Sequence, residues 1–412
     1  MIKNRKYINY QKKKKYILIC LVLLSLILTN RKLLILNKIS YNESTYYTIW
    51  ATAIHTTRPP PIKLDNNSLR QIFRISAGGE KVRIKLSNIL GKSDLEVKKV
   101  CIADLVSESE INRKSMKYLT FNGKYNIIIK KGKEIYSDTI IYPLKAFSKI
   151  AISIYFGSVP KKLSGHGCSL TYSYIEKGNK IKKQKFSHKN KVDHSYFISL
   201  IEISSDKPKK VIVCFGDSIT DGVKLNNGTR DNYPDMLFEK IYNNNKNTDI
   251  AIVNEGINGD KLTKKGIERY QHDVLDIKGV RYIIVLYGVN DLNVLNATSK
   301  EIISGYKEII KKAHKKNIFI YAGTILPFSR FKYKYIWNKN KEKVRQECND
   351  WIRKTKPKNG GFDGVFDFEK YIKDPKNETK MKDIYDCGDG IHPNFEGYVK
   401  MIELINDLNL FT

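Results

Sequence analysis

A strand that ends in a glycine and a serine constrains this chain more than any other feature. Residues Val211–Phe215 form an unbroken apolar run, and Gly216, Asp217 and Ser218 follow it directly. Such runs are typical of strands buried on both faces of a parallel sheet. Open α/β sheets place their chemistry just outside the carboxyl ends of their strands. Ser218 is therefore a candidate nucleophile, and the alternative is an ordinary turn built from Gly, Asp and Ser.

The rest of the C-terminal half alternates between strands and helices, which is the pattern of an α/β fold. Short apolar runs predict further strands at 249–253, 281–286, 318–322 and 365–366. Apolar residues at helical spacing predict helices at 233–242, 263–277, 342–353 and 395–408, and Ser299 is predicted to cap a helix that reaches Ala313. Together with Val211–Phe215, these runs predict a sheet of five strands in a domain at 209–412.

The N-terminal half reads as mostly β. The segments Leu69–Ser76 and Lys81–Ser87 alternate between apolar and polar residues around a Gly78-Gly79 turn, which predicts a hairpin with one buried face. Further strands are predicted at 97–105, 126–129, 139–142, 150–156, 169–174 and 196–203. Several strands separated by turns indicate a β-sandwich-like domain at 45–205. The polar, proline-containing segment 204–208 is the predicted linker.

Residues 1–40 have the layout of a targeting segment. Residues 1–15 are strongly basic, and Tyr16–Leu28 is almost wholly apolar, as in the charged and apolar regions of a signal peptide. The apolar run is shorter than the roughly 20 residues that span a bilayer. A cleaved signal peptide and an uncleaved membrane anchor both remain open. Either one places the body of the protein outside the cytoplasm, secreted or at the cell surface.

The chain carries a formal net charge of +32. Lysines are spread along its whole length, and no nucleic-acid-binding motif concentrates them. The sequence therefore predicts no nucleic-acid partner, and a basic surface would instead favour anionic substrates or anionic cell surfaces.

The six cysteines show no C-x-x-C spacing, so a zinc site is not expected. If the chain is exported, disulfides between Cys101 and Cys168 or between Cys348 and Cys387 are one interpretation, and the sequence alone does not fix the pairing. The alternative is that these four residues are buried thiols.

Three successive predicted strands end in polar, glycine-containing loops, at 216–218, 256–259 and 288–290, and a polar cluster lies at Asp389–His392. Because parallel strands end at one edge of a sheet, the three loops are expected to converge. His392 would act as the base that takes the Ser218 proton, and Asp389 would orient its ring. The Ser218 N–H, the Gly259 N–H and the Asn290 amide are candidate donors to an oxyanion.

These four blocks resemble the SGNH hydrolases, also called GDSL esterases and lipases. The matching segments are Gly-Asp-Ser-Ile-Thr-Asp at 216–221, Asn-x-Gly-x-x-Gly at 254–259, Gly-x-Asn-Asp at 288–291 and Asp-x-x-His-Pro at 389–393. The resemblance implies catalytic roles for Ser218, Gly259, Asn290, His392 and Asp389, and a three-layer α/β/α, flavodoxin-like, five-stranded parallel sheet. Trp50, the 69–88 segment and the Tyr/Trp-rich 321–351 segment are similar to a bacterial-type subgroup with an N-terminal β-sandwich.

The expected function is that of a serine esterase that removes acyl or acetyl groups, with carbohydrate-linked esters as the leading substrates and no metal or cofactor. The alternatives are a lipid esterase such as a lysophospholipase, transfer of the acyl group to an acceptor other than water, and a non-catalytic glycan-binding protein. A flavodoxin-like FMN or phosphate binder is disfavoured, because such a site has no use for a distant Asp-x-x-His.

The other ionisable residues near these motifs have structural interpretations. Asp291 is expected to be a hydrogen-bonding carboxylate, and Asp217 and Asp221 are expected to brace the nucleophile turn. Glu255 stands where a small or apolar residue is expected, and it would oppose an anionic substrate if it faced the site. Among the histidines, His272 and His314 are expected at the surface, and structural or surface positions are expected for His55, His166, His188 and His194.

Overall fold

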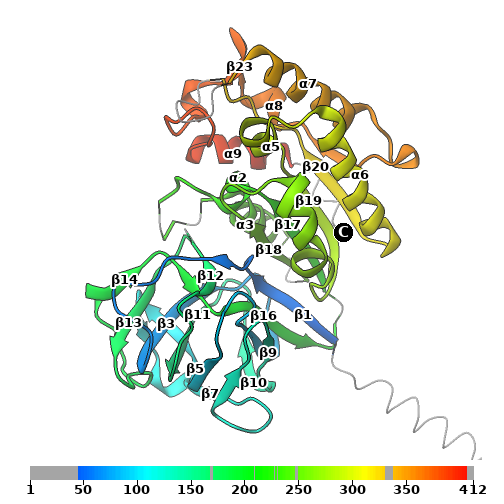
Figure 1. Ribbon diagram of the computed structural model, residues 1–412. Coiled ribbons are helices and arrows are strands. Elements are labelled where there is room, and N and C mark those ends of the chain that lie inside the picture. Colours follow the sequence, from blue (N-terminus) through cyan, green and yellow to red (C-terminus); the bar gives the residue numbers. More distant parts are fainter. Residues whose placement is uncertain are drawn as a thin grey trace, which may run out of the picture. The chain divides into compact units, whose positions relative to one another are not determined.

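A five-stranded parallel sheet forms the centre of the C-terminal half (Figure 1). The computed structural model describes residues 45–405 except 168–169, 208, 227, 230, 246–248 and 330–336. The sheet has the order β18-β17-β19-β20-β21, and every neighbouring pair is parallel. Its strands are β17 (Lys210–Gly216), β18 (Ile250–Gly256), β19 (Val280–Leu286), β20 (Phe319–Gly323) and β21 (Gly364–Phe366). The apolar run of β17 is completely buried, which confirms the predicted strand that is buried on both faces.

Helices cover both faces of this sheet. Cys214 of β17 contacts Tyr233 of α3 (Tyr233–Asn245), and the next residue, Phe215, packs on Tyr270 of α4 (Ile267–Tyr270) at 5.3 Å between ring centroids. Because successive strand residues point to opposite faces, α3 and α4 lie on opposite sides of the sheet. Helix α9 (Phe395–Leu404) packs beside α3, and α6 (Ser299–Lys315) packs beside α4 and α7 (Lys339–Lys354). The predicted three-layer α/β/α arrangement is confirmed.

Helix starts follow the local chemistry of the sequence. Thr298, rather than the predicted Ser299, caps α6: its hydroxyl accepts the Glu301 N–H, and the Glu301 side chain accepts the Thr298 N–H. Besides α4, the short helices are α2 (Ser218–Asp221), α5 (Val289–Leu295) and α8 (Phe368–Ile372). Strands β22 (Lys373–Asp374) and β23 (Asn377–Met381) form a small hairpin.

The N-terminal half is built from antiparallel sheets. One has the order β1-β16-β4-β10 with β9 on β4, one has the order β14-β13-β3-β11-β5-β6 with β7 and β8 on β5, and a small third sheet has the order β15-β12-β2. Phe156 of one large sheet packs on Phe197, which precedes β16 of the other, at 5.4 Å between ring centroids. The bounds are β1 (Thr45–Ala51), β2 (His55–Thr56), β3 (Asn67–Arg74), β4 (Gly79–Ser87), β5 (Leu95–Ser107), β6 (Glu110–Ile111), β7 (Lys117–Leu119), β8 (Ile127–Ile129), β9 (Glu134–Tyr136), β10 (Ile140–Leu144), β11 (Lys149–Phe156), β12 (Ser164–His166), β13 (Ser173–Lys177), β14 (Lys191–Val192), β15 (Ser195–Tyr196) and β16 (Ile198–Ser205).

The predicted hairpin around Gly78-Gly79 is wrong. Strand β3 pairs with β11 and β13, whereas β4 pairs with β10, β16 and β9, so the turn carries the chain from one sheet to the other. The burial pattern explains the difference: β3 is buried along nearly its whole length, as in the middle of a sheet, while β4 alternates between buried Val82, Ile84 and Leu86 and more exposed basic residues.

The sandwich joins the parallel sheet at its edge strand. Thr52, just after β1, forms a parallel bridge to Asn254 of β18, and the Ser76 hydroxyl accepts the Ile252 N–H at 3.2 Å. Unpaired edge strands are liable to aggregate, and these contacts cover part of the β18 edge. The boundary predicted between 205 and 209 falls between β16 and β17, and Tyr46–Thr412 form one compact unit.

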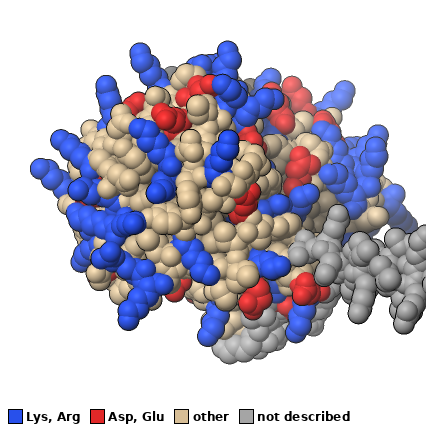
Figure 2. All heavy atoms as spheres, turned by 90° about the horizontal axis from the view of Figure 1, so that it is seen from below, with Lys and Arg blue, Asp and Glu red and all other residues tan. Residues whose placement is uncertain are grey.

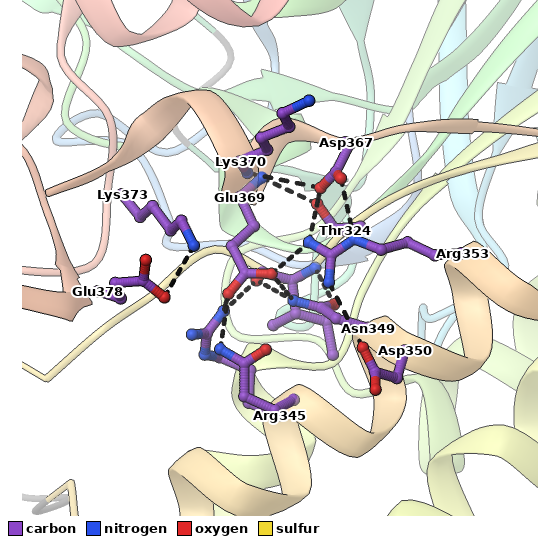
Figure 3. A network of polar contacts seen from close by, with 12 residues as sticks. Thr324, Arg345, Asn349, Asp350, Arg353, Asp367, Glu369, Lys370, Lys373 and Glu378 are labelled. Atoms are coloured by element: carbon purple, nitrogen blue, oxygen red, sulfur yellow. Dashed lines mark hydrogen bonds and ion pairs between the residues drawn. The ribbon is translucent and has the colours of Figure 1, made fainter. Parts of the chain in front are cut away.

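An ion network centred on the buried pair Glu369–Arg345 connects α7 and α8 beyond the ends of β20 and β21 (Figure 3). Glu369 pairs with Arg345 at 2.7 Å and with Arg353, and Arg353 also donates to both oxygens of Asp367 at 2.7 and 2.9 Å. Thr324, directly after β20, accepts the Glu369 N–H at 2.8 Å. Buried charges that are fully paired in this way favour one arrangement of the elements that carry them.

Two expectations concern the termini and the cysteines. The signal peptide or anchor predicted at residues 1–40 lies outside the described residues, and no helix among those described is both long and apolar enough to cross a bilayer. Cys101, Cys214, Cys348 and Cys387 are free thiols, so the disulfide considered between Cys348 and Cys387 is absent. Cys168, the other candidate partner of Cys101, lies outside the described residues.

Candidate active site

Ser218 is the first residue of α2, just beyond the carboxyl end of β17. Asp217 caps the helix, because its side chain accepts the Ile219 N–H at 3.0 Å, and Gly222 ends it in the left-handed conformation. Gly216 is needed for close packing here: a Cβ at this position would lie 2.0 Å from Thr220 Oγ1 and 2.6 Å from the Leu286 carbonyl oxygen. The strand therefore turns sharply and presents Ser218 at the edge of the sheet.

His392 and Asp389 meet Ser218 from the other end of the domain. His392 Nε2 lies 2.8 Å from Ser218 Oγ, and His392 Nδ1 lies 2.7 Å from Asp389 Oδ2. The second oxygen of Asp389 accepts the backbone N–H groups of Ile391 and His392, both at 3.0 Å. The three residues thus have the geometry of a nucleophile, a base and the group that orients the base.

The loop from 386 to 393 holds this arrangement. Asp386 Oδ1 accepts the N–H groups of Gly388 and Gly390, and Asp386 bridges to Pro393. Burial alone would raise the pKa of Asp389, but the hydrogen bonds from the His392 ring and from the backbone outweigh it and hold that pKa well below its usual range. Asp389 is therefore an anion at neutral pH, as the orienting acid needs to be.

The loops that carry Gly259 and Asn290 leave the sheet at the same level as the nucleophile turn. In the parallel register, Gly216 lies opposite Gly256 of β18 and opposite Leu286 of β19. Gly259 has a positive φ of 74°, which favours glycine. Asn290 lies in the first turn of α5, and its buried side-chain nitrogen has no hydrogen-bond partner among the described residues. A buried donor without a partner is costly, which is typical of a group kept for a ligand.

The Ser218 N–H is a further available donor. It lies at the first position of α2, where backbone N–H groups have no partner within the helix. Together with the Gly259 N–H and the Asn290 amide, it gives the set of donors that a developing oxyanion requires.

Asp291 connects two of these loops, in agreement with its expected structural role. Its carboxylate accepts the Leu262 N–H at 2.9 Å and both the N–H and the hydroxyl of Thr263, at 2.9 and 2.7 Å. The segment after Gly259 is thereby tied to the helix that carries Asn290.

Arg269 is a buried residue that the sequence analysis did not single out. It pairs with Asp260 at 2.8 Å and Asp273 at 3.0 Å, and it donates to the carbonyl groups of Gly216 and Glu255 at 3.2 and 2.8 Å. It therefore holds the ends of β17 and β18 together. The spacing of Arg269 and Asp273, four residues apart in a predicted helix, was the one signal for this interaction.

Several acidic groups near the nucleophile are buried. Burial raises the pKa of Asp217 to about 8, with its hydrogen bond from Ile219 opposing the shift, and the carboxylates of Asp291, Asp260 and Asp221 adding to it. Burial likewise raises the pKa of Glu255 well above its usual range. The Asp217 carboxyl is therefore mainly neutral at pH 7. Glu255 is 1% exposed, so its carboxyl group is not presented to an incoming substrate.

The histidines differ from one another in their surroundings. His272 lies at the surface, as expected, with its side chain 40% exposed, and it also bridges Asp273 at 2.6 Å and Glu134 of the sandwich at 2.9 Å. His314 pairs with Asp363 at 3.0 Å. His166, expected to be structural, is buried and contacts Asp221.

One group of residues among those described has metal-ligand spacing: Cys387, Asp389 and His392, whose ligand atoms all lie within 4.8 Å of one another. Both nitrogens of His392 are already engaged with Ser218 and Asp389. Burial raises the pKa of the Cys387 thiol to about 11, which disfavours the thiolate that a metal would need. The donor set fits proton transfer better than metal binding.

Residues 214–400 match the model of the GDSL-like Lipase/Acylhydrolase family. Among solved structures, the chain is similar to a lipolytic protein of the G-D-S-L family from Desulfitobacterium hafniense, with 21% identity over 48% of this chain and 98% of that chain and a TM-score of 0.39. It is also similar to a GDSL-like lipase from Bacteroides thetaiotaomicron (19% identity, 48% and 86% covered, TM-score 0.38) and to the acetyl xylan esterase AlAXEase (19% identity, 47% and 97% covered, TM-score 0.37). A search of curated proteins gave no match.

Proposed function

Since residues 214–400 form a domain of the GDSL-like lipase/acylhydrolase family, which makes the chain an ester-hydrolysing enzyme, we propose that it is a serine esterase with Ser218 as its nucleophile. The observation that carries this assignment is the hydrogen-bonded series Ser218–His392–Asp389, with distances of 2.8 and 2.7 Å. A hydroxyl, an imidazole and a carboxylate bonded in this order supply the nucleophile, the base and the orienting acid that acyl transfer uses.

The chemistry follows from these contacts. Ser218 Oγ attacks the ester carbonyl carbon while its proton moves to His392 Nε2, and Asp389 stabilises the imidazolium that forms. The carbonyl oxygen becomes an oxyanion, which accepts hydrogen bonds from the Ser218 and Gly259 N–H groups and from the Asn290 amide. The intermediate collapses, and His392 returns the proton to the leaving alcohol. Water then attacks the acyl-enzyme with His392 again as the base, which releases the carboxylic acid and restores the Ser218 hydroxyl.

O-acyl groups on carbohydrate are the substrates that we favour. The sandwich adjoins the edge strand whose loop carries Gly259, so it extends the protein surface beside the nucleophile, a layout that suits a polymer. On the face formed by the sandwich, Lys and Arg are more prominent than Asp and Glu (Figure 2), as expected from the net charge of +32. Such a face would attract polysaccharides that carry acidic groups.

Lipid esters are the second candidate. Two large apolar side chains close to His392 in sequence are exposed, Ile384 at 64% and Phe395 at 48%. The Asn394 side chain donates to the Ile384 carbonyl at 2.9 Å, so the segments that carry the two residues are in contact. Exposed apolar groups beside an active site favour long acyl chains.

A fluorophosphonate probe tests the nucleophile. We expect the wild type to be labelled and Ser218→Ala to be unlabelled and inactive, while Ser304→Ala, at an exposed position on α6, is labelled like the wild type. Equal labelling of Ser218→Ala would refute the assignment. A folded wild type that is neither labelled nor active would favour the non-catalytic glycan-binding alternative.

Substrate class is tested separately. Release of acetate from acetylated polysaccharides, compared with p-nitrophenyl esters of increasing chain length, distinguishes the two candidates. A preference for acyl chains of eight or more carbons over acetyl would contradict the carbohydrate proposal. Product analysis with added alcohols would detect transfer to an acceptor other than water.

We propose that the protein is exported from the cytoplasm. Export is supported by the basic residues 1–15 followed by the apolar run Tyr16–Leu28. Fractionation of the producing cells, with N-terminal sequencing of the mature protein, tests both export and cleavage; recovery of all the protein in the cytosol would contradict the proposal.

A further inference from the structure

A histidine of the sandwich reaches the nucleophile turn. His166, the last residue of β12, is 3% exposed, and its two ring nitrogens have defined partners. Nδ1 lies 2.8 Å from the Ala53 carbonyl oxygen, and Nε2 lies 3.0 Å from Asp221 Oδ1. Because a carbonyl oxygen only accepts, Nδ1 carries a proton, and a second proton is shared between Nε2 and the carboxylate. His166 and Asp221 therefore form a buried, charge-assisted pair.

Asp221 also forms a hydrogen bond with the loop that carries Gly259. It is the last residue of α2, three positions after Ser218. While Oδ1 faces His166, Oδ2 accepts the Asn258 N–H at 3.1 Å, and Asn258 directly precedes Gly259. The two oxygens of the Asp221 carboxylate thus connect α2 both to the sandwich, through His166, and to the loop that carries Gly259, through Asn258.

The same segment also bonds to α2 and to the end of β17. The Asn254 side chain donates to the Thr220 carbonyl of α2 at 2.8 Å, and the Ile257 N–H donates to the Gly216 carbonyl of β17 at 3.1 Å. A Cβ at Gly256 would lie 2.3 Å from the Asp221 nitrogen, so loop and helix are in direct contact. These bonds hold the loop up to Ile257. The Asp221 carboxylate holds the next residue, Asn258, whose carbonyl belongs to the same peptide plane as the Gly259 N–H.

We propose that His166 and Asp221 are positioning residues of the esterase site. His166 fixes the orientation of the Asp221 carboxylate, and Asp221 fixes the position of the loop so that the Gly259 N–H points at the oxyanion. The β-sandwich is then part of the active site without touching substrate. This inference rests on the proposed function, since it assumes that Gly259 donates to an oxyanion.

The physical basis is preorganisation. Oxyanion donors lower the barrier only if they already point to the position where negative charge develops. A carboxylate with a single backbone partner can rotate, whereas one that is also paired with a buried histidine is held on both sides. Residues that orient ligating or reacting groups in this way commonly contribute about 10- to 100-fold to activity.

The test compares two variants with a matched control. His166→Ala removes the ring that orients the Asp221 carboxylate, and Asp221→Asn removes the charge while keeping a side-chain oxygen for Asn258. The control is His188→Ala, which removes a sandwich histidine that pairs with Glu108 at a partly exposed position. Active sites are counted by fluorophosphonate titration, so kcat refers only to folded, competent enzyme.

For His166→Ala we expect kcat to fall about 10- to 100-fold, less than the loss of a whole oxyanion donor, with KM within about threefold of the wild type. Affinity for a trifluoromethyl ketone, which forms a tetrahedral adduct, should fall in parallel with kcat/KM. Asp221→Asn should lower kcat by a similar factor, and the double variant should be no worse than either single variant, because the two residues act as one unit. The control should match the wild type.

His166→Gln provides a rescue variant, since its amide still presents an N–H donor toward Asp221; we expect it to recover much of the lost kcat. It also keeps the proposal testable if His166→Ala does not fold. If the titrated variants turn over like the wild type and only their melting temperature falls, the pair is merely structural and the inference is refuted. An inactive wild type would instead refute the proposed function.

Discussion

Asn290 offers a test in which activity and stability should move in opposite directions. Its side-chain nitrogen is buried and has no hydrogen-bond partner among the described residues, and the residue itself is 9% exposed. If this amide is kept for an oxyanion, the free enzyme bears the cost of an unsatisfied donor. We therefore predict that Asn290→Leu, which removes the amide at similar volume, is catalytically poor and at least as stable as the wild type.

Both magnitudes follow from the burial of this one group. Loss of an oxyanion donor typically lowers kcat by about 100- to 1,000-fold, or about 2.7–4 kcal/mol. A buried unsatisfied polar group costs about 1–3 kcal/mol, and leucine also has a better helix propensity than asparagine by up to about 0.7 kcal/mol. Imperfect packing of the new side chain offsets part of this gain, so we expect an increase of about 1 kcal/mol in the free energy of unfolding.

The assay is kcat on a p-nitrophenyl ester together with urea unfolding of the same samples. Asn293→Leu is the matched control, because Asn293 lies on the same helix, is 2% exposed and also has a buried side-chain atom, Oδ1, without a partner among the described residues. The control should gain stability similarly and keep its activity. A fully active Asn290→Leu, or one that loses stability by 2 kcal/mol or more, would refute the assignment of Asn290 as a donor.

Two further predictions concern ionisable groups whose pKa values are raised in the folded protein. Burial raises the pKa of Asp217 from 3.8 to about 8, so the folded state retains a proton that the unfolded chain releases, and this contribution to stability is lost as pH rises through that interval. Asp217→Asn, which keeps the cap on Ile219, should therefore gain stability relative to the wild type between pH 4 and about pH 8 in urea titrations; a constant difference would contradict this. The His272 ring donates hydrogen bonds to the carboxylates of Asp273 and Glu134, which raises its pKa from 6.5 to about 10, so its contribution to stability is complete below pH 6.5 and is lost as pH approaches about 10. His272→Gln should flatten the decline in unfolding free energy over that range, and an unchanged slope would show that the pair does not stabilise the fold.

The sequence predicts the nucleophile region well because its determinants are local. The strand before Ser218 reads as an unbroken apolar run, and Asp389 reaches the His392 ring within three residues. The convergence of these distant segments needs one further rule, that parallel strands end at one edge, and the register of Gly216 with Gly256 and Leu286 obeys it.

The partners of strands and histidines in the sandwich could not be predicted in this way. Alternation along Lys81–Ser87 indicates which face of the strand is buried, but it does not indicate which strand lies beside it. For this reason the sequence predicts a hairpin with the preceding segment, Leu69–Ser76, although the two strands belong to different sheets. His166 and His272 bond to groups 55 and 138 residues away, Asp221 and Glu134 respectively. No local periodicity encodes such pairs.

The charge balance around Ser218 is a second reason to expect that the sandwich contributes to the proposed chemistry. Asp221, Asp260 and Asp291 lie close enough to Asp217 to raise its pKa, and uncompensated negative charge there would oppose an oxyanion at the same place. Two basic side chains lie against these carboxylates: Arg269 pairs with Asp260, and His166 pairs with Asp221. The raised pKa of Asp217, about 8, favours its neutral form. One of the two basic partners belongs to the sandwich, so an isolated 209–412 domain would expose the Asp221 carboxylate and release the loop before Gly259. We therefore expect the hydrolase domain alone to be a poorer esterase than the whole chain, even where it folds.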